Sequence, residues 1–288
     1  MTLFRKSGIS LLVPTQNSEH TVEMCIRSFA GLADEIIVVD NGSTDRTIAI
    51  VQQMEREFPI LRFYNAPHLK HLYENRQYAL ERSSYKWIAR IDSDFVAYTD
   101  GPLSSRNLRK IVLGTKTGWR PIAFTLRIAN LFLDLQHTGT PRSSRPQGKG
   151  RYVPELTDLV RMRIVEHFPG MRFGRVGRWE SVRYAKFWRK VDLTEQPFWF
   201  HCEMKSPRDY FLRSQRTDWR ENGNFSRFPT VEDFALESAR RAYGTNDLDK
   251  AAEIYMHEEV YPFLKEYDPS EHYPYPETIL AMGATALR

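Results

Sequence analysis

The chain has 288 residues, of which 41% are hydrophobic and 13% aromatic, enough for a packed globular core of one large domain or two tightly joined halves. Its net charge of +5 suits anionic small molecules, a membrane surface or weak nucleic-acid contact without choosing among them. The two cysteines, Cys25 and Cys202, stand far apart and lack a Cys-x-x-Cys spacing, so the sequence indicates neither a zinc knuckle nor a disulfide framework and favours buried free thiols in a reducing compartment.

No apolar window predicts a signal peptide or a membrane span. The apolar stretch that follows Arg5 and Lys6 is short and is broken at Pro14, and no later window reaches transmembrane length. We therefore expect a soluble cytoplasmic protein. Its basic and aromatic surface leaves peripheral contact with the inner face of a membrane open.

Strand-like and helix-like segments alternate through the first third of the chain. Compact apolar runs predict strands, apolar residues at helical spacing predict helices, and Ser43-Thr44-Asp45 supplies an N-cap for the second helix. In chain order the expected elements are a strand at 9–13, a helix at 18–30, a strand at 35–39, a helix at 45–58, a strand at 61–64, a helix at 70–84 and a strand at 87–91. This alternation predicts an α/β fold with a mainly parallel central sheet flanked by helices.

Each of these strands ends in a polar cluster. The clusters are residues 14–17, 40–45, 65–67 and 92–94. Ligands of open α/β sheets bind in the crevice beyond the carboxyl ends of the strands, so the four clusters are expected to converge on one crevice. Asp40 can accept hydrogen bonds there from a ribose or a base edge, although local turn and cap chemistry is the alternative.

Two carboxylates, Asp92 and Asp94, follow the end of the fourth predicted strand. If the extended geometry persists, both side chains point to the same side, where they repel each other unless a cation joins them. A hard divalent ion such as Mg²⁺ or Mn²⁺ takes oxygen ligands and often bridges carboxylates to substrate phosphates. The alternative is a solvated turn that caps the next helix.

Three segments together resemble the family 2 glycosyltransferases of the GT-A fold. They are residues 9–17 (ISLLVPTQN), residues 35–47 (EIIVVDNGSTDRT) and residues 91–94 (IDSD), which match in order and spacing over roughly the first 110 residues. The resemblance implies a Rossmann-like nucleotide-binding half at 1–115, an acceptor-binding half of the same catalytic domain at 116–230, and a C-terminal extension of helices and an extended tail at 231–288. The family more often has a tyrosine at the position of Gln16, which puts the packing of the base in question.

The resemblance also implies the roles of individual residues. A nucleotide-diphosphate sugar, with UDP favoured, is the expected donor substrate. The divalent cation, Mn²⁺ or Mg²⁺, is expected on Asp94, and Asp92 is expected to face the ribose and sugar. The remaining residues expected to contact the donor are Thr15, Asn17, Asp40, Arg76 and Ser93.

Two later residues are candidates to complete the donor and metal site. His201 follows an aromatic strand, and many relatives of this family carry a late histidine that completes the metal site. Imidazole is acceptable to Mn²⁺, although a histidine among aromatic residues is as readily a core residue. Lys205 is the candidate to meet the donor diphosphate.

An inverting transferase needs a carboxylate that deprotonates the acceptor hydroxyl. Glu180, in an aromatic and arginine-rich stretch, is the first choice and Asp158 the second. The alternative for Glu180 is a surface carboxylate paired with Arg178 or Arg183, an arrangement that stabilises little.

The second half of the chain is less regular. Residues 138–151 have the composition of a mobile loop that either closes over the donor or simply connects elements, and the basic residues of 161–178 suit an anionic acceptor or a lipid phosphate. Helical spacing resumes after about residue 230, with the helices expected to pack on the catalytic core, and residues 261–276 are expected to form an extended strap. No nucleic-acid-binding motif accompanies the basic residues, so nucleic acid is not expected as a partner.

The sequence therefore predicts an inverting, metal-assisted glycosyltransferase of polysaccharide biosynthesis that acts on a saccharide or lipid-linked acceptor. A catalytically silent module that binds sugar nucleotides or glycans on the same fold is the alternative. Loss of metal-dependent nucleotide-sugar binding in Asp94→Ala would favour the first, and retained binding without turnover the second. A nucleotidyltransferase is less consistent, because its glycine-rich phosphate loop is absent near the N-terminus.

Overall fold

The computed structural model describes residues 5–139, 161–176, 179–183 and 188–286. The chain forms two compact units. The first contains residues 1–129, 158–202 and 269–288, and the second contains residues 130–157 and 203–268. Residues 140–160, and with them most of the predicted loop at 138–151 and the candidate base Asp158, lie outside the described residues.

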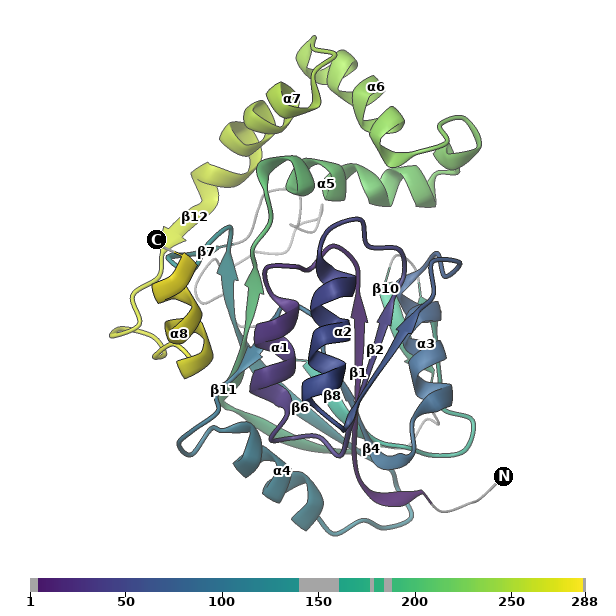
Figure 1. Cartoon of the computed structure of the whole chain (residues 1–288), viewed down its shortest axis with the longest axis vertical. Helices are drawn as coiled ribbons and strands as arrows, with labels where there is room; N and C mark the ends of the chain where they lie inside the picture. The colour runs from purple at the N-terminus through teal and green to yellow at the C-terminus, as the bar shows by residue number, and fades with distance from the viewer. Residues whose placement is uncertain (1–4, 140–160, 177–178, 184–187, 287–288) are drawn as a thin grey trace. The chain divides into compact units, whose positions relative to one another are not determined.

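The first unit is built on a mixed eight-stranded sheet with the order β3-β2-β1-β4-β8-β6-β11-β5 (Figure 1). Its strands are β1 (Lys6–Thr15), β2 (Glu35–Asp40), β3 (Leu61–Asn65), β4 (Tyr85–Arg90), β5 (Phe95–Ala97), β6 (Ile122–Phe132), β8 (Arg161–Glu166) and β11 (Arg189–Glu203). Strands β1 to β4 pair in parallel, as the sequence predicts. Strand β8 pairs antiparallel with both β4 and β6, and β5 pairs antiparallel with β11.

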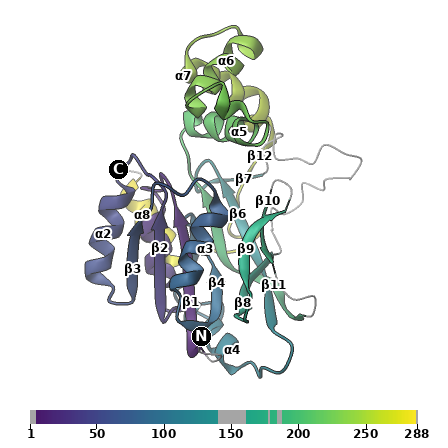
Figure 2. The same cartoon turned by 90° about the vertical axis from the view of Figure 1, so that its right-hand side faces the viewer.

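Helices cover both faces of the parallel half, which confirms the predicted α/β architecture (Figures 1 and 2). They are α1 (Val22–Phe29), α2 (Thr47–Glu57), α3 (Leu72–Arg82) and α4 (Ser105–Gly114). The alternation of side chains along β1 explains the two layers: Leu11 and Val13 join the core with α1 and α2, whereas Leu12 joins the core with α3. Strand β2 is buried along its whole length, as expected of a strand covered on both faces.

Two further elements complete the first unit. A two-stranded ribbon of β9 (Arg172–Val176) and β10 (Trp179–Arg183) packs beside α3, where Phe173 and Val182 enter the core under that helix. Helix α8 (Glu277–Ala286) follows a segment tied to the end of β5: the Tyr98 hydroxyl donates to the Pro274 carbonyl at 2.6 Å, and Thr99 donates through its backbone N–H and its hydroxyl to Glu277 at 3.1 and 2.9 Å.

The second unit has an apolar core of its own, which the sequence pattern did not predict. The predicted helices after residue 230 are present, but they bury their apolar faces against α5 through residues such as Phe211, Ala235 and Ala252. The elements are β7 (His137–Gly139), α5 (Pro207–Glu221), a 3-10 turn (Asn224–Ser226), α6 (Val231–Tyr243), α7 (Leu248–Tyr255), a π-helical turn (Met256–Val260), a 3-10 turn (Tyr261–Phe263) and β12 (Leu264–Glu266). Strand β12 pairs with β7, so the predicted strap at 261–276 includes a turn and a strand.

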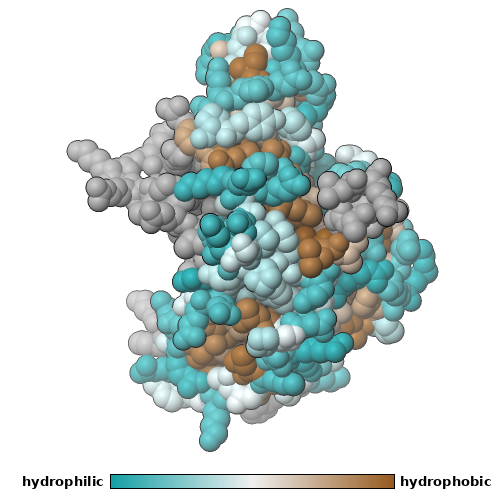
Figure 3. Space-filling view, turned by 90° about the vertical axis from the view of Figure 1, so that its left-hand side faces the viewer, coloured by the Kyte–Doolittle hydropathy of each residue, from teal (hydrophilic) through white to brown (hydrophobic). Residues whose placement is uncertain are grey.

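Hydrophilic residues cover most of the face drawn in Figure 3, and the hydrophobic ones gather in a few patches. Within the described part of the chain, no helix combines the length and the apolar character needed to cross a membrane.

Candidate active site

The loops after β1 and β2 are joined by hydrogen bonds at the carboxyl edge of the sheet. The backbone N–H of Asn17 donates to the Ser43 hydroxyl at 2.8 Å, and the Asn17 side chain accepts from the backbone N–H of Thr44 at 2.9 Å. Asn17 adopts a positive φ of 49°, a conformation that asparagine tolerates better than most residues. Two of the polar strand ends that the sequence singled out therefore lie together.

Asp40 is used locally by the turn that follows β2. One carboxylate oxygen accepts from the backbone N–H groups of Gly42 and Ser43 at 2.9 and 2.8 Å, and the other accepts from the Ser43 hydroxyl. The Asp40 side chain is fully buried, and Gly42 has a φ of 102° that favours glycine. These bonds are the local turn interactions that formed the alternative interpretation of Asp40. Contact between Asp40 and a nucleotide stays a prediction.

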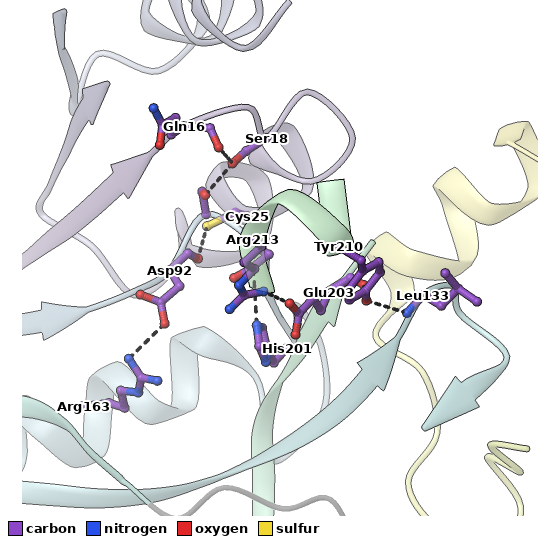
Figure 4. A network of polar contacts seen from close by, with 12 residues as sticks. Gln16, Ser18, Cys25, Asp92, Leu133, Arg163, His201, Glu203, Tyr210 and Arg213 are labelled. Atoms are coloured by element: carbon purple, nitrogen blue, oxygen red, sulfur yellow. Dashed lines mark hydrogen bonds and ion pairs between the residues drawn. The ribbon is translucent and has the colours of Figure 1, made fainter. Parts of the chain in front are cut away.

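Two arginines, one from helix α3 and one from strand β8, hold Asp92. Arg76, on α3 and almost completely buried, donates to one carboxylate oxygen of Asp92 and to the carbonyl of Leu12, the latter at 3.1 Å. Arg163, on β8 and also buried, donates to the other oxygen at 3.1 Å (Figure 4). Arg76 is thus placed beside Asp92, whereas Arg163 was not among the predicted site residues.

These two guanidinium groups decide the protonation state of Asp92. Burial raises the pKa of the Asp92 carboxyl, but the positive charges of Arg163 and Arg76 outweigh burial and hold that pKa below its usual range. The side chain is 29% exposed, so an ionised carboxylate remains open to the crevice.

Asp94 and His201 meet on the other side of the same loop. The His201 Nε2 atom lies 3.3 Å from an Asp94 carboxylate oxygen, and their side chains are only 15% and 18% exposed. The antiparallel pairing of β11 with β5 positions the histidine, because His201 stands opposite Phe95. The backbone N–H of Cys202 donates to the Asp94 carbonyl at 2.7 Å and fixes the neighbouring loop.

Phe95 contacts residues from both the Asp92 group and the Asp94 group. The guanidinium of Arg163 lies 4.7 Å from the ring centroid of Phe95, and the His201 ring meets the edge of the same ring at 5.2 Å. Phe95 is itself fully buried. Phe95 thus contacts Arg163, a partner of Asp92, and His201, the partner of Asp94.

Asp94 and His201 suit a divalent cation that also binds substrate. In the described part of the chain, no group of three or more His, Cys, Asp or Glu residues is arranged to hold a metal ion. A complete protein cage is therefore not formed by these residues. One carboxylate and one imidazole instead match a site whose other positions are taken by phosphate oxygens, as for Mn²⁺ or Mg²⁺.

The remaining predicted residues have different surroundings. Ser93 is buried and shares a 2.8 Å hydrogen bond with Ser18. The Thr15 hydroxyl is buried and makes no hydrogen bond within the described residues. Glu180 stands on β10 opposite Arg175, and its side chain lies outside the described atoms. Lys205 belongs to the second unit.

At the end of β11, the second unit has a polar network of its own (Figure 4). Glu203 pairs with Arg213, and its carbonyl accepts from the Tyr210 hydroxyl at 2.6 Å and from the backbone N–H of Leu133 at 3.0 Å. Leu133 has a φ of 73°, so this network holds a strained backbone in place.

Comparison with known proteins gives a partial match. Residues 10–102 match the family described as Glycosyl transferase family 2. The chain is 38% identical over 90 residues to the "Lipopolysaccharide core biosynthesis glycosyltransferase LpsC" of Rhizobium meliloti (strain 1021), which is 31% of this chain and 32% of that protein. It is 31% identical over 86 residues to an "Uncharacterized glycosyltransferase" of Rickettsia bellii (strain RML369-C), which is 30% of this chain and 27% of that protein. The match thus spans about a third of the length of these relatives.

Among solved structures, the chain is similar to S. aureus TarS 1-349. In the complex with UDP the identity is 14%, the TM-score is 0.42, and the match covers 82% of this chain and 72% of that one. In the complex with UDP-GlcNAc the identity is 15%, the TM-score is 0.40, and the match covers 74% of this chain and 66% of that one.

Proposed function

We propose that this chain transfers a sugar from a nucleotide-diphosphate sugar to a hydroxyl of a saccharide or lipid-linked acceptor, because its residues 10–102 match glycosyl transferase family 2. The observation that carries the proposal is the position of Asp92 and Asp94 at the end of β4, inside the family match. UDP is the favoured nucleotide, and inversion at the anomeric carbon is the favoured course.

The ionised Asp92 is suited to accept hydrogen bonds from ribose or sugar hydroxyls. Arg76 and Arg163 hold it in one orientation, and each carboxylate oxygen keeps a further lone pair for a ligand. Because the arginines neutralise its charge, Asp92 does not repel an incoming diphosphate as a bare carboxylate would. Arg163 thereby also brings positive charge to the crevice where the anionic leaving group departs.

Asp94 and His201 are the residues proposed to hold the divalent cation. When bound, the cation supplies Lewis-acid stabilisation of the negative charge that develops on the departing diphosphate. Imidazole binds metal in its neutral form, so His201 must be deprotonated to contribute. Glu180 and Asp158 remain the proposed general bases for the acceptor hydroxyl.

The experiment that tests the proposal measures binding of UDP-sugars by calorimetry with and without Mn²⁺. Asp94→Asn and His201→Ala are expected to remove the Mn²⁺-dependent part of the affinity. The chain offers a matched control in Asp134 and His137, a carboxylate–imidazole pair of the second unit at 2.8 Å, where Asp134→Asn and His137→Ala should leave binding unchanged. An equal loss of Mn²⁺-dependent affinity in the variants of both pairs would contradict the assignment of the cation to Asp94 and His201.

Turnover separates the enzyme from a silent binding module. Release of nucleoside diphosphate is followed with a panel of UDP-sugars and saccharide or lipid-linked acceptors. Metal-dependent release that Asp94→Asn abolishes supports the transferase. Binding without release across the panel, together with an unaffected Glu180→Ala variant, would favour the silent module.

A further inference from the structure

A group of basic residues lies at the amino end of β4, at the sheet edge opposite the proposed crevice. It consists of Lys86, Lys116, Arg120, Arg189 and Lys190, which we call the basic face. Hydrogen bonds hold its parts together. Lys86 Nζ donates to the Thr117 hydroxyl at 2.9 Å, and the Arg189 side chain donates to the Lys116 carbonyl at 2.7 Å.

Positive charge dominates this surface. Four of the five basic residues are exposed, and the Lys86 side chain is one-third exposed at 33%. Glu166 is buried and lies 3.2 Å from Lys86 Nζ, while Asp192, two positions beyond Lys190 on β11, is exposed.

A histidine at the same edge contributes no charge near neutral pH. The backbone N–H of His167 donates to the Lys86 carbonyl at 2.8 Å. Burial and the neighbouring positive charge of Arg5 lower the pKa of His167 to about 4. The positive charge of this edge near neutral pH therefore comes from lysine and arginine.

A large aromatic residue, Trp119, projects from the basic face. Trp119 is 78% exposed, the highest value among the large hydrophobic residues described as exposed. The Arg120 guanidinium lies 4.6 Å from the Trp119 ring centroid. An exposed indole beside an arginine, on a surface rich in basic residues, suits the headgroup region of an anionic bilayer, where the ring enters the interface and the cations contact phosphate groups. A soluble polyanion would use the charges alone.

We propose that the basic face, with Trp119, docks the chain on an anionic lipid bilayer. The surface is separate from the crevice, so this proposal does not depend on the proposed function. Lys86 and Asp92 are six positions apart along β4 and its continuation, which corresponds to about 20 Å of extended chain. The docked crevice would therefore stand clear of the lipid headgroups.

The test is co-sedimentation of the full chain with vesicles of phosphatidylcholine alone or with about 30% phosphatidylglycerol. Each basic residue near an anionic surface strengthens binding about fivefold, so Lys116→Ala with Arg120→Ala is expected to weaken binding to the anionic vesicles about 25-fold. Arg241→Ala with Lys250→Ala, which removes two exposed charges of the second unit, is the control and should have no effect.

Trp119→Ala distinguishes a bilayer from a soluble polyanion. Loss of the interfacial indole is expected to weaken vesicle binding about tenfold, with Trp119→Phe intermediate and nucleotide-sugar binding unchanged. Folding of each variant is checked by circular dichroism, and exposure of the residue makes a folding defect unexpected. The proposal fails if both kinds of vesicle bind equally, if the control pair weakens binding as much, or if heparin binds as tightly as vesicles and Trp119→Ala affects neither.

Discussion

Arg163→Met tests whether an arginine from β8 keeps Asp92 ionised. The substitution keeps an apolar chain of similar reach but removes the 3.1 Å charged hydrogen bond to Asp92. Hydrogen bonds to charged groups contribute about 1.5–3 kcal/mol, and the 29% exposure of Asp92 lets water replace part of this, so we expect a loss of about 2 kcal/mol in the free energy of unfolding at pH 7.

The pH dependence of this loss follows from the lowered pKa of Asp92. A carboxylate whose pKa is lower in the folded state adds stability above its unfolded pKa of about 3.9, and this stability disappears as the pH falls through the folded pKa. Without Arg163, the pKa of Asp92 in the folded state should lie closer to its value in the unfolded chain. The difference between the native chain and Arg163→Met should therefore be full at pH 7 and shrink as the pH falls below about 4.

Urea unfolding followed by tryptophan fluorescence measures both the loss of unfolding free energy and its dependence on pH. Arg163→Met, Asp92→Asn and the double variant form a cycle with an expected coupling of about 1.5 kcal/mol. Arg172→Met, at an exposed arginine of β9, is the control and should change stability by less than about 0.5 kcal/mol. The reasoning is refuted if Arg163→Met lowers the unfolding free energy equally at pH 7 and pH 3. It is also refuted if Arg163→Met lowers the unfolding free energy of the Asp92→Asn variant as much as that of the native chain.

Three further outcomes follow from local geometry. Gly8→Ala should lower the unfolding free energy by at least about 2 kcal/mol in urea titrations, because Gly8 has a φ of 148° and a new Cβ would lie 2.3 Å from the Tyr85 ring; an unchanged midpoint would contradict this. Glu277→Gln should cost about 1 kcal/mol by removing a charged acceptor from Thr99, and faster hydrogen exchange at the Thr99 amide would locate the loss. Burial raises the pKa of both cysteine thiols, so a thiol reagent should react with neither in the native chain and with both in urea; rapid native reaction would show that one is accessible.

The parallel half of the fold was predictable because its signals are local. Strand β2 is a continuous run of buried apolar residues, and the helix predicted at 70–84 is observed as Leu72–Arg82. The N-cap predicted at Ser43-Thr44-Asp45 was wrong, because the N-cap residue of α2 is Arg46 and its side chain makes no capping hydrogen bond, although Asp45 accepts from the backbone N–H of Thr47 at 2.9 Å.

The antiparallel half was not predictable, because its pairings join residues far apart in the chain. Arg163 reaches Asp92 across 71 positions, and nothing in the sequence around Arg163 distinguishes it from neighbouring basic residues. The pairing of β11 with β5 likewise brings His201 to Asp94, and only the resemblance to a known family pointed there. The separate core of α5, α6 and α7 was missed because helical spacing shows that a face is buried but not which partner buries it.

The loop from Asp92 to Asp94 is anchored through its backbone as well as its side chains. The Asp92 carbonyl accepts from the backbone N–H of Phe95 at 3.0 Å and from the Cys25 thiol at 3.5 Å, and the Asp94 carbonyl accepts from Cys202. A segment held in this way has already lost most of its conformational entropy before any ligand arrives. Ordering the loop would then cost little free energy on donor binding, so more of the favourable free energy of each contact would contribute to the affinity.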